Sequence, residues 1–157
     1  LVPEVYAVSS LGTDRAVSLL PEAELNCAMT DRLDSFVEEV IEPAAREFLE
    51  TGLTGLGIAA SYVCRTRNGQ PETKQSEHGK ANAVDVARFV MADGRTISVL
   101  GDWADEGAAG DFLRAVHDKA CGPFTTVIGP DGDEYHQGHF HLDLQKRGRD
   151  GQTTFCQ

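Results

Sequence analysis

The histidines of this chain are unevenly distributed, and their clustering limits how the chain can fold. Four of the five lie in two short segments, with His78 in the first and His136, His139 and His141 in the second. Asp85 follows the first segment closely. Imidazole and carboxylate groups brought together are typical of metal binding and proton transfer. Both uses require the two segments to meet in the folded chain.

The second segment has the pattern of a strand. Side chains alternate between the two faces of a strand, so His139, His141 and Asp143 would share one face. The other face would be apolar and would carry Phe140, Leu142 and Leu144. We therefore expect residues 139–144 to form the last strand of the core, with a polar, imidazole-rich face.

Asp85 has a matching position in an earlier expected strand, over residues 84–90. Val84 and Val86 can enter the core, which leaves Asp85 on the other face, where it can meet the histidines if the two strands pair. The Asp-Gly pair within residues 91–94 is a good hairpin signal. Residues 95–100 are therefore expected to form an antiparallel neighbour of this strand.

Other segments have the periodicity of helices. Apolar residues at helical spacing predict a helix from Thr30 to about Thr51, which Gly52 ends and Pro43 kinks or splits. The segment 108–120 has the same spacing. Short apolar runs predict strands at residues 56–64 and 124–128. Together these elements predict an α+β fold with a mainly antiparallel sheet of about four strands backed by helices.

Length and charge limit the domain organisation and the partners. A chain of 157 residues suits one domain. Residues 1–26 show little periodicity and are expected to form an N-terminal arm, with a single domain over residues 27–157. The net charge of −11 would be repelled by phosphate, so nucleic acid is not an expected partner. No apolar run approaches the ~20 residues that a membrane-spanning helix needs, so we expect no membrane span.

The four cysteines indicate an oxidising location. They are widely spaced and form no Cys-x-x-Cys pair, which disfavours a cysteine zinc site. Two disulfides are the favoured interpretation, and they imply a periplasmic or secreted protein. Among the three possible pairings we favour Cys27 with Cys64 and Cys121 with Cys156, because each would join a helix-rich segment to a later element. The alternative is four reduced thiols in a cytosolic protein.

The histidine segments suit a zinc site. Neutral imidazole and carboxylate are good zinc ligands, and three protein ligands leave a position open for catalysis. His78, Asp85 and one late histidine would supply such a set, and the remaining histidines could transfer protons. Two alternatives are surface histidines without a metal and a structural zinc site closed by four ligands. His117 is expected to be a solvated or capping histidine of its helix, and a calcium site at residues 131–134 is disfavoured because the twelve-residue loop pattern is lacking.

The two histidine segments also resemble a known family. Residues 76–86, with the sequence SEHGKANAVDV, and the later pattern His136-x-x-His139-x-His141-Leu142-Asp143 are similar to the C-terminal domain of bacterial extensin-like proteins. Those proteins in turn resemble the zinc D-alanyl-D-alanine peptidases and the penicillin-insensitive murein endopeptidase, in the superfamily shared with lysostaphin and Sonic hedgehog. The resemblance covers roughly residues 27–156, and it implies a hedgehog/DD-peptidase-like fold.

The resemblance also implies roles for individual residues. His78, Asp85 and His141 would bind zinc, and His139 would stabilise or shuttle charge beside it. His136 stands where the endopeptidase type has a histidine and the carboxypeptidase type has a glutamate general base.

One arginine is also expected at the site. Arg65 matches the arginine that would bind the substrate carbonyl or the oxyanion. Arg67 is an alternative for that role, and a solvated loop charge is the alternative for Arg65.

The expected function is a zinc-dependent peptidase, periplasmic or secreted, that acts as a monomer on the peptides of peptidoglycan. It would be of the D,D-endopeptidase or carboxypeptidase type. A different class of function is also open, namely a catalytically silent zinc-bearing module that binds cell-wall peptides or a partner protein. A proton acceptor beside the metal would distinguish the two, and His136 favours the enzyme.

Overall fold

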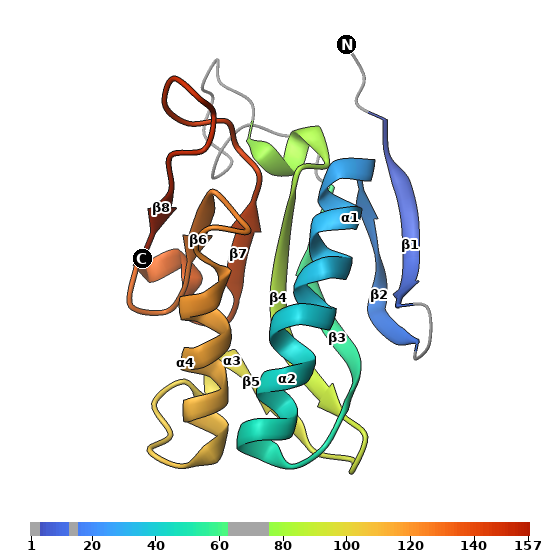
Figure 1. Ribbon diagram of the computed structural model, residues 1–157, viewed down its shortest axis with the longest axis vertical. Coiled ribbons are helices and arrows are strands. Elements are labelled where there is room, and N and C mark those ends of the chain that lie inside the picture. The colour runs from blue at the N-terminus through green and yellow to red at the C-terminus, as the bar shows by residue number, and fades with distance from the viewer. Residues whose placement is uncertain (1–3, 13–15, 63–75) are drawn as a thin grey trace.

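The computed structural model describes residues 4–12, 16–62 and 76–157, which form one mixed sheet with helices on it (Figure 1). Within these residues the sheet has eight strands in the order β1-β2-β3-β4-β7-β6-β8, and β5 pairs with β4 beside this path. The strands are β1 (Tyr6–Leu11), β2 (Val17–Leu25), β3 (Leu53–Ala60), β4 (Ala83–Met91), β5 (Thr96–Ser98), β6 (Thr126–Ile128), β7 (Phe140–Asp143) and β8 (Phe155–Cys156). The pairs β2–β3 and β6–β8 are parallel, and the other pairs are antiparallel.

The α+β class is confirmed, but the prediction of about four mainly antiparallel strands was wrong. The segment predicted to be an N-terminal arm contributes β1 and β2, and β2 pairs in parallel with β3. Most residues of β1 are exposed, so this strand lacks the apolar alternation that would mark it in the sequence. At the other end of the sheet, β8 is only two residues long, which is too short for any periodicity.

The first helical run extends further toward the N-terminus than predicted. It comprises α1 (Cys27–Phe36), the π-helical turn η1 (Val37–Ile41), α2 (Glu42–Ala44) and the π-helical turn η2 (Ala45–Leu49). The side chain of Asn26 caps α1 by accepting a hydrogen bond from the Met29 amide at 2.8 Å. Pro43 lies between the two π turns, as expected for a residue that lacks an amide N–H and disrupts regular α-helical bonding. The run ends at Glu50, which takes a left-handed conformation with φ of 56°.

The predicted hairpin and second helix are present. The antiparallel strands β4 and β5 flank the Asp-Gly turn, but β5 ends at Ser98, earlier than expected. Ser98 caps the short helix α3 (Val99–Asp102), because its hydroxyl accepts a hydrogen bond from the Gly101 amide. The helix α4 (Ala108–Ala120) has the predicted bounds. No helix among the described residues is long and apolar enough to cross a membrane.

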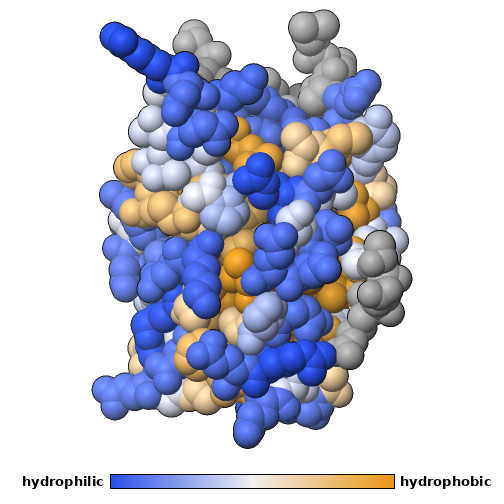
Figure 2. Space-filling view, viewed as in Figure 1, coloured by the Kyte–Doolittle hydropathy of each residue, from blue (hydrophilic) through white to orange (hydrophobic). Residues whose placement is uncertain are grey.

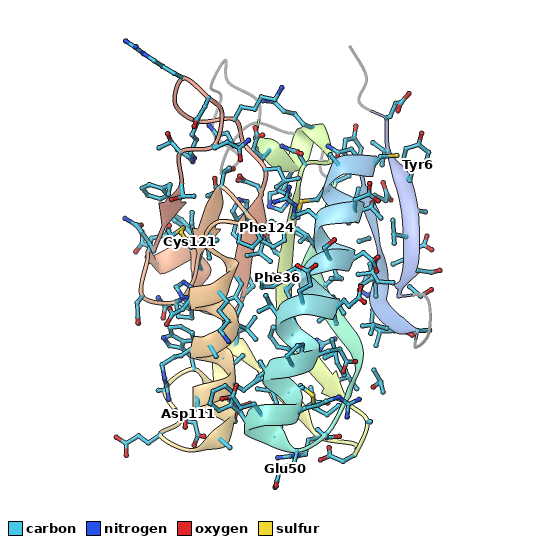
Figure 3. The ribbon with its side chains drawn as sticks, viewed as in Figure 1. Tyr6, Phe36, Glu50, Asp111, Cys121 and Phe124 are labelled. Carbon is cyan, nitrogen blue, oxygen red and sulfur yellow. A yellow bond between two sulfur atoms is a disulfide. The ribbon has the colours of Figure 1, made fainter. Side chains whose placement is uncertain are left out.

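The helices α1 and α4 cover one face of the sheet, and the core lies between these layers (Figure 1). Phe36 of α1 meets Phe124 edge to face, with 5.2 Å between ring centroids (Figure 3). The outer surface on this side is mostly hydrophilic, with apolar side chains visible in patches between polar ones (Figure 2). This packing occupies one face of the central strands and leaves their other face for polar side chains.

One of the two predicted disulfides is present. Cys121, at the end of α4, is bonded to Cys156 of β8, which confirms that pairing. The predicted pairing of Cys27 with Cys64 was wrong for Cys27, which is a free and exposed thiol at the start of α1. Cys64 lies outside the described residues. A disulfide needs its two Cα atoms within about 7 Å, a condition that spacing along the sequence cannot establish.

Candidate metal centre

Strand pairing brings the two histidine segments together. In the antiparallel pair β4–β7, Asp85 lies directly opposite His141. Their neighbours Val84, Val86 and Phe140 are buried in the core against the helices. Because side chains alternate along a strand, Asp85 and His141 point to the opposite face of the sheet. This is the face that the sequence pattern predicted for them.

His78 reaches the same place from a short turn. It lies in the 3₁₀ helix η4 (Glu77–Lys80), immediately before β4. The Ser76 hydroxyl caps this turn by accepting a hydrogen bond from the His78 amide at 3.1 Å. Ala81 then takes a left-handed conformation, φ 55°, which turns the chain into β4.

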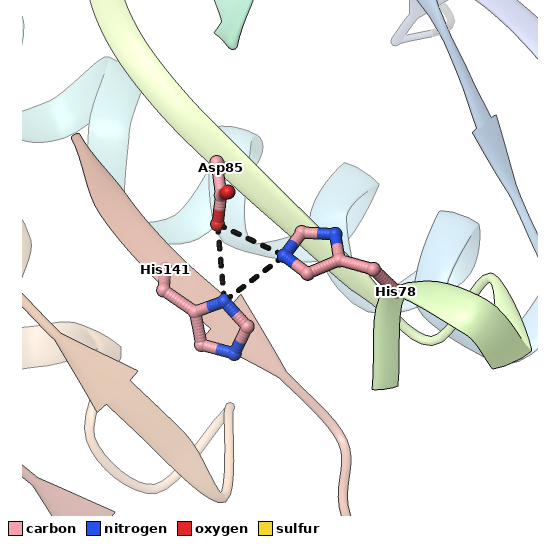
Figure 4. Close-up of side chains that lie close together, drawn as sticks. All are labelled: His78, Asp85 and His141. Atoms are coloured by element: carbon pink, nitrogen blue, oxygen red, sulfur yellow. Dashed lines mark hydrogen bonds and ion pairs between the residues drawn. The ribbon is translucent and has the colours of Figure 1, made fainter. Parts of the chain in front are cut away.

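Three donor atoms converge at this point (Figure 4). His78 Nε2 lies 3.2 Å from His141 Nδ1 and 3.3 Å from Asp85 Oδ1. His141 Nδ1 lies 3.0 Å from the same Asp85 oxygen. Ligands bound tetrahedrally to zinc at about 2.0–2.1 Å are separated from one another by roughly 3.3 Å. The three atoms therefore already have the mutual spacing that such an ion requires.

Hydrogen bonds to the far side of each ring direct both imidazoles inward. His78 Nδ1 donates to the carbonyl oxygen of Ser61 at 2.7 Å, which leaves Nε2 facing the group. His141 Nε2 lies 2.7 Å from Asp143 Oδ2 and donates to that carboxylate, which leaves Nδ1 facing the group. Metal-binding histidines characteristically donate their other ring N–H in this way. The donor set therefore fits a metal ion held by His78, Asp85 and His141.

The pKa values of Asp85 and His141 are both strongly shifted by their surroundings. Burial would raise the pKa of Asp85, but hydrogen bonds with His141 and His78 outweigh it and hold that pKa well below its usual range. Burial would lower the pKa of His141, but hydrogen bonds with Asp143 and Asp85 outweigh it and raise that pKa to about 9. The two carboxylates thus favour a positive charge between them. A proton or a metal cation can supply that charge, so the two compete.

Two further histidines line the same site. His139 Nε2 lies 3.6 Å from Asp85 Oδ2, and burial lowers the pKa of His139 despite this carboxylate. His136 lies in the 3₁₀ helix η5 (Glu134–His136), with its ring centroid 5.1 Å from that of His139 and 5.8 Å from that of His141. All four clustered histidines therefore meet, as the sequence predicted.

Asp133 holds the ring of His136. Its carboxylate accepts a hydrogen bond from His136 Nδ1 and another from the Tyr135 amide at 2.8 Å. Burial raises the pKa of Asp133, but the hydrogen bond with His136 outweighs it, and the pKa is lowered overall. From the sequence, Asp133 was considered only as part of a disfavoured calcium site, and this contact was missed. The sequence signal for this contact is the separation of Asp133 and His136 by three positions, which brings two side chains together in a helical turn.

A cavity of about 680 Å³ opens over the group. Its lining includes the three metal-ligand candidates and two further histidines, His136 and His139, together with Thr126, Gln145, Arg147 and Phe155. The site is therefore large enough to take a small peptide beside the three donor atoms.

The remaining predicted residues are two arginines and His117. Arg65 and its alternative Arg67 lie outside the described residues. His117 is not a solvated histidine, because its side chain is only 15% exposed and its ring packs against Trp103 and Phe140. Its Nε2 bonds to the carbonyl oxygen of Gln157 at 2.9 Å, so it belongs to the packing of α4 and not to the metal group.

Fold and site together define an α+β protein with a buried His–Asp–His group that could hold a metal ion. A model of the family described as extensin-like protein C-terminus matches residues 3–157, so the chain belongs to this family. No curated protein and no solved structure matches the chain significantly.

Replacing Asp143 with asparagine is expected to weaken the binding of a metal ion, with zinc as the probe, about 10- to 100-fold without unfolding the protein. The asparagine amide is neutral, so it accepts the hydrogen bond from His141 Nε2 less strongly than the carboxylate does. The His141 ring is then held less firmly in the orientation that points Nδ1 at the metal position. Competition with a chromogenic chelator measures the affinity, and Asp118→Asn, at an exposed acid outside the site, is the matched control. An affinity within twofold of the wild type would show that Asp143 does not support the ligand.

Protein stripped of metal with a chelator is expected to lose stability as the pH rises from about 6.5 to about 9. The folded chain holds a proton on His141 up to about pH 9, whereas the unfolded chain releases it near pH 6.5. This stabilisation, on the order of 3 kcal/mol, is complete below pH 6.5 and is lost as the pH passes through 9. Urea denaturation at pH 6 and pH 9 measures it. The difference in unfolding free energy between pH 6 and pH 9 should be smaller in the His141→Gln variant than in the wild type. An equal difference in both proteins would show that His141 is not the group that titrates.

Proposed function

We propose that the protein is a zinc-dependent peptidase that cleaves an amide bond in the peptides of peptidoglycan, in the periplasm or outside the cell. The observation that carries this proposal is the convergence of His78 Nε2, Asp85 Oδ1 and His141 Nδ1 beside two further histidines in one cavity. The resemblance to the zinc D-alanyl-D-alanine peptidases supports the substrate class. The disulfide between Cys121 and Cys156 supports a location outside the reducing cytosol.

Zinc is the proposed metal because of the donor set. Two imidazoles and one carboxylate are typical of catalytic zinc sites, where three protein ligands leave one position open. When bound, zinc supplies Lewis acidity to a scissile carbonyl and makes water nucleophilic near neutral pH. His78, Asp85 and His141 would hold it.

His136 is the proposed general base. Because Asp133 accepts the hydrogen bond from its Nδ1, the lone pair of Nε2 is free to accept a proton. The carboxylate also stabilises the imidazolium that forms when His136 takes the proton, as in other histidine bases oriented by an acid. His136 can then return this proton to the leaving amine.

His139 is the proposed electrostatic partner. Burial lowers its pKa, so the ring is neutral near pH 7 and keeps one N–H to donate to a developing oxyanion. Its place beside Asp85 puts it next to the donor atoms that would hold the metal. The proposal gives Arg65 a second contact with the same oxygen, as the family resemblance implies.

Incubation with purified muropeptides tests the proposal. The zinc-loaded protein is expected to convert cross-linked or full-length stem peptides into shorter products, identified by chromatography and mass spectrometry, and a chelator should stop the reaction. Protein carrying Asp85→Asn is the matched negative control, because it removes one ligand charge with little change of volume. Unchanged chromatograms together with measurable binding would instead indicate a silent zinc-bearing module.

A further inference from the structure

Arg147 lines the same cavity as the metal group. Among the described lining residues it is the only lysine or arginine. The chain as a whole carries a net charge of −11, so a positively charged side chain in this cavity contrasts with the acidic character of the protein.

The guanidinium of Arg147 is held in place by neutral groups. Its Nε and Nη2 donate to Thr126 Oγ1 at 3.2 and 3.1 Å, and Nη2 also donates to Gln145 Oε1 at 3.1 Å. The ring of Phe155 lies against it, with the guanidinium carbon 5.2 Å from the ring centroid. These contacts fix its orientation. A guanidinium has five N–H donors, and the contacts of Nε and Nη2 do not use those of Nη1.

No carboxylate of the described residues forms an ion pair with Arg147. The carboxylates that line the cavity already have partners: Glu77 pairs with Lys80, Asp85 with the metal-group histidines, Asp133 with His136, and Asp143 with His141. A half-buried, oriented arginine without a counter-charge suits the recognition of an anion from outside the chain.

Strand register fixes where this arginine lies relative to the metal group. In the pair β6–β7, Thr126 lies opposite Asp143 and Ile128 lies opposite His141. Thr126, which holds the guanidinium, is therefore displaced from His141 by two residues along the sheet, or roughly 7 Å. A ligand that spans this distance would present one polar group to the metal-group residues and an anion to Arg147.

We propose that Arg147 binds a carboxylate of the peptide that occupies the cavity, so that the ligand is an acidic peptide whose carboxylate lies within about one or two residues of the bond at the metal group. This inference rests on the proposed function for the identity of the ligand as a wall peptide. The carboxylate comes either from the peptide C-terminus or from an acidic residue. Exposed Tyr135 and Phe155 provide apolar surface beside it.

Binding of matched acid and amide peptides tests this inference. The probes are diacetyl-L-lysyl-D-alanyl-D-alanine with a free or amidated C-terminus, and a stem tetrapeptide with the D-glutamate carboxylate free or amidated. Titration calorimetry uses the zinc-loaded protein carrying His136→Ala, in which the probes stay intact. At least one acid is expected to bind about 10- to 100-fold more tightly than its amide, and which acid does so identifies the source of the carboxylate.

Variants at position 147 distinguish a role of Arg147 in binding the carboxylate from a purely structural role. Arg147→Gln is expected to remove the preference for the acid while leaving amide binding within about twofold, and Arg147→Lys to retain part of it. Arg149→Gln, at an exposed neighbour, is the control. Equal weakening of acid and amide, or no preference for either acid in the parent protein, would overturn the inference. If the Arg147→Gln variant fails to fold, the ratio of acid to amide affinity in the His136→Ala protein still tests whether the cavity prefers a carboxylate. Failure of the proposed peptidase function gives a different result. In that case the wild-type protein would still bind the acid peptide in preference to the amide, but it would not cleave it.

Discussion

Replacement of His141 with alanine is expected to weaken zinc binding by at least about 100-fold and to abolish any zinc-dependent activity. His141 supplies one of three converging donor atoms, and its other ring nitrogen is held by Asp143. Removal of the ring leaves two ligands, too few for a catalytic zinc site. The measurement is metal content after gel filtration, combined with competition against a chromogenic chelator.

The matched control for this variant is His117→Gln. His117 is also a mostly buried histidine, but its ring packs against Trp103 and bonds to a backbone carbonyl. This variant should retain one equivalent of zinc, even if its thermal stability falls. Equal zinc content in both variants would mean that the bound metal lies elsewhere in the chain.

Replacement of His136 with alanine is expected to slow muropeptide hydrolysis about 100- to 10,000-fold while one equivalent of zinc remains bound. His136 contributes no atom to the converging group, but its ring lies beside that of His141 and is oriented by Asp133. Loss of a general base lowers kcat and leaves the metal ligands in place. Initial rates and metal content are measured on the same preparation.

Asp133→Asn provides the companion to this variant. The amide can still contact His136 but no longer stabilises its charged form, so a smaller loss of kcat is expected. A His136→Ala protein that hydrolyses at the wild-type rate would assign the proton transfer to another residue. One that loses zinc would instead place His136 among the ligands.

The site was more predictable from the sequence than the sheet that holds it. Alternation of polar and apolar residues placed His141 on the face away from the core, and the same rule placed Asp85. These strands are central, with one face packed on helices, so their pattern is clear. The contact of His136 with Asp133 depends on a turn of only three residues, for which the sequence offers little periodicity.

The edges of the sheet were less predictable. β1 is largely exposed, and β2 joins the sheet through a parallel pairing with β3 that a local pattern does not reveal. Arg147 was not identified because it follows β7 in a polar segment, where an arginine ordinarily faces solvent. Its hydrogen bonds to Thr126 of β6 and to Gln145 hold it at the cavity, and these long-range contacts leave no local pattern in the sequence.

Anomalous X-ray scattering at the zinc absorption edge, measured on crystals of the zinc-loaded protein, tests the central claim most directly. The expected result is a single strong peak within about 2.0–2.2 Å of His78 Nε2, Asp85 Oδ1 and His141 Nδ1. Absence of a peak between these three atoms, or a strong peak held by other residues, would contradict the account.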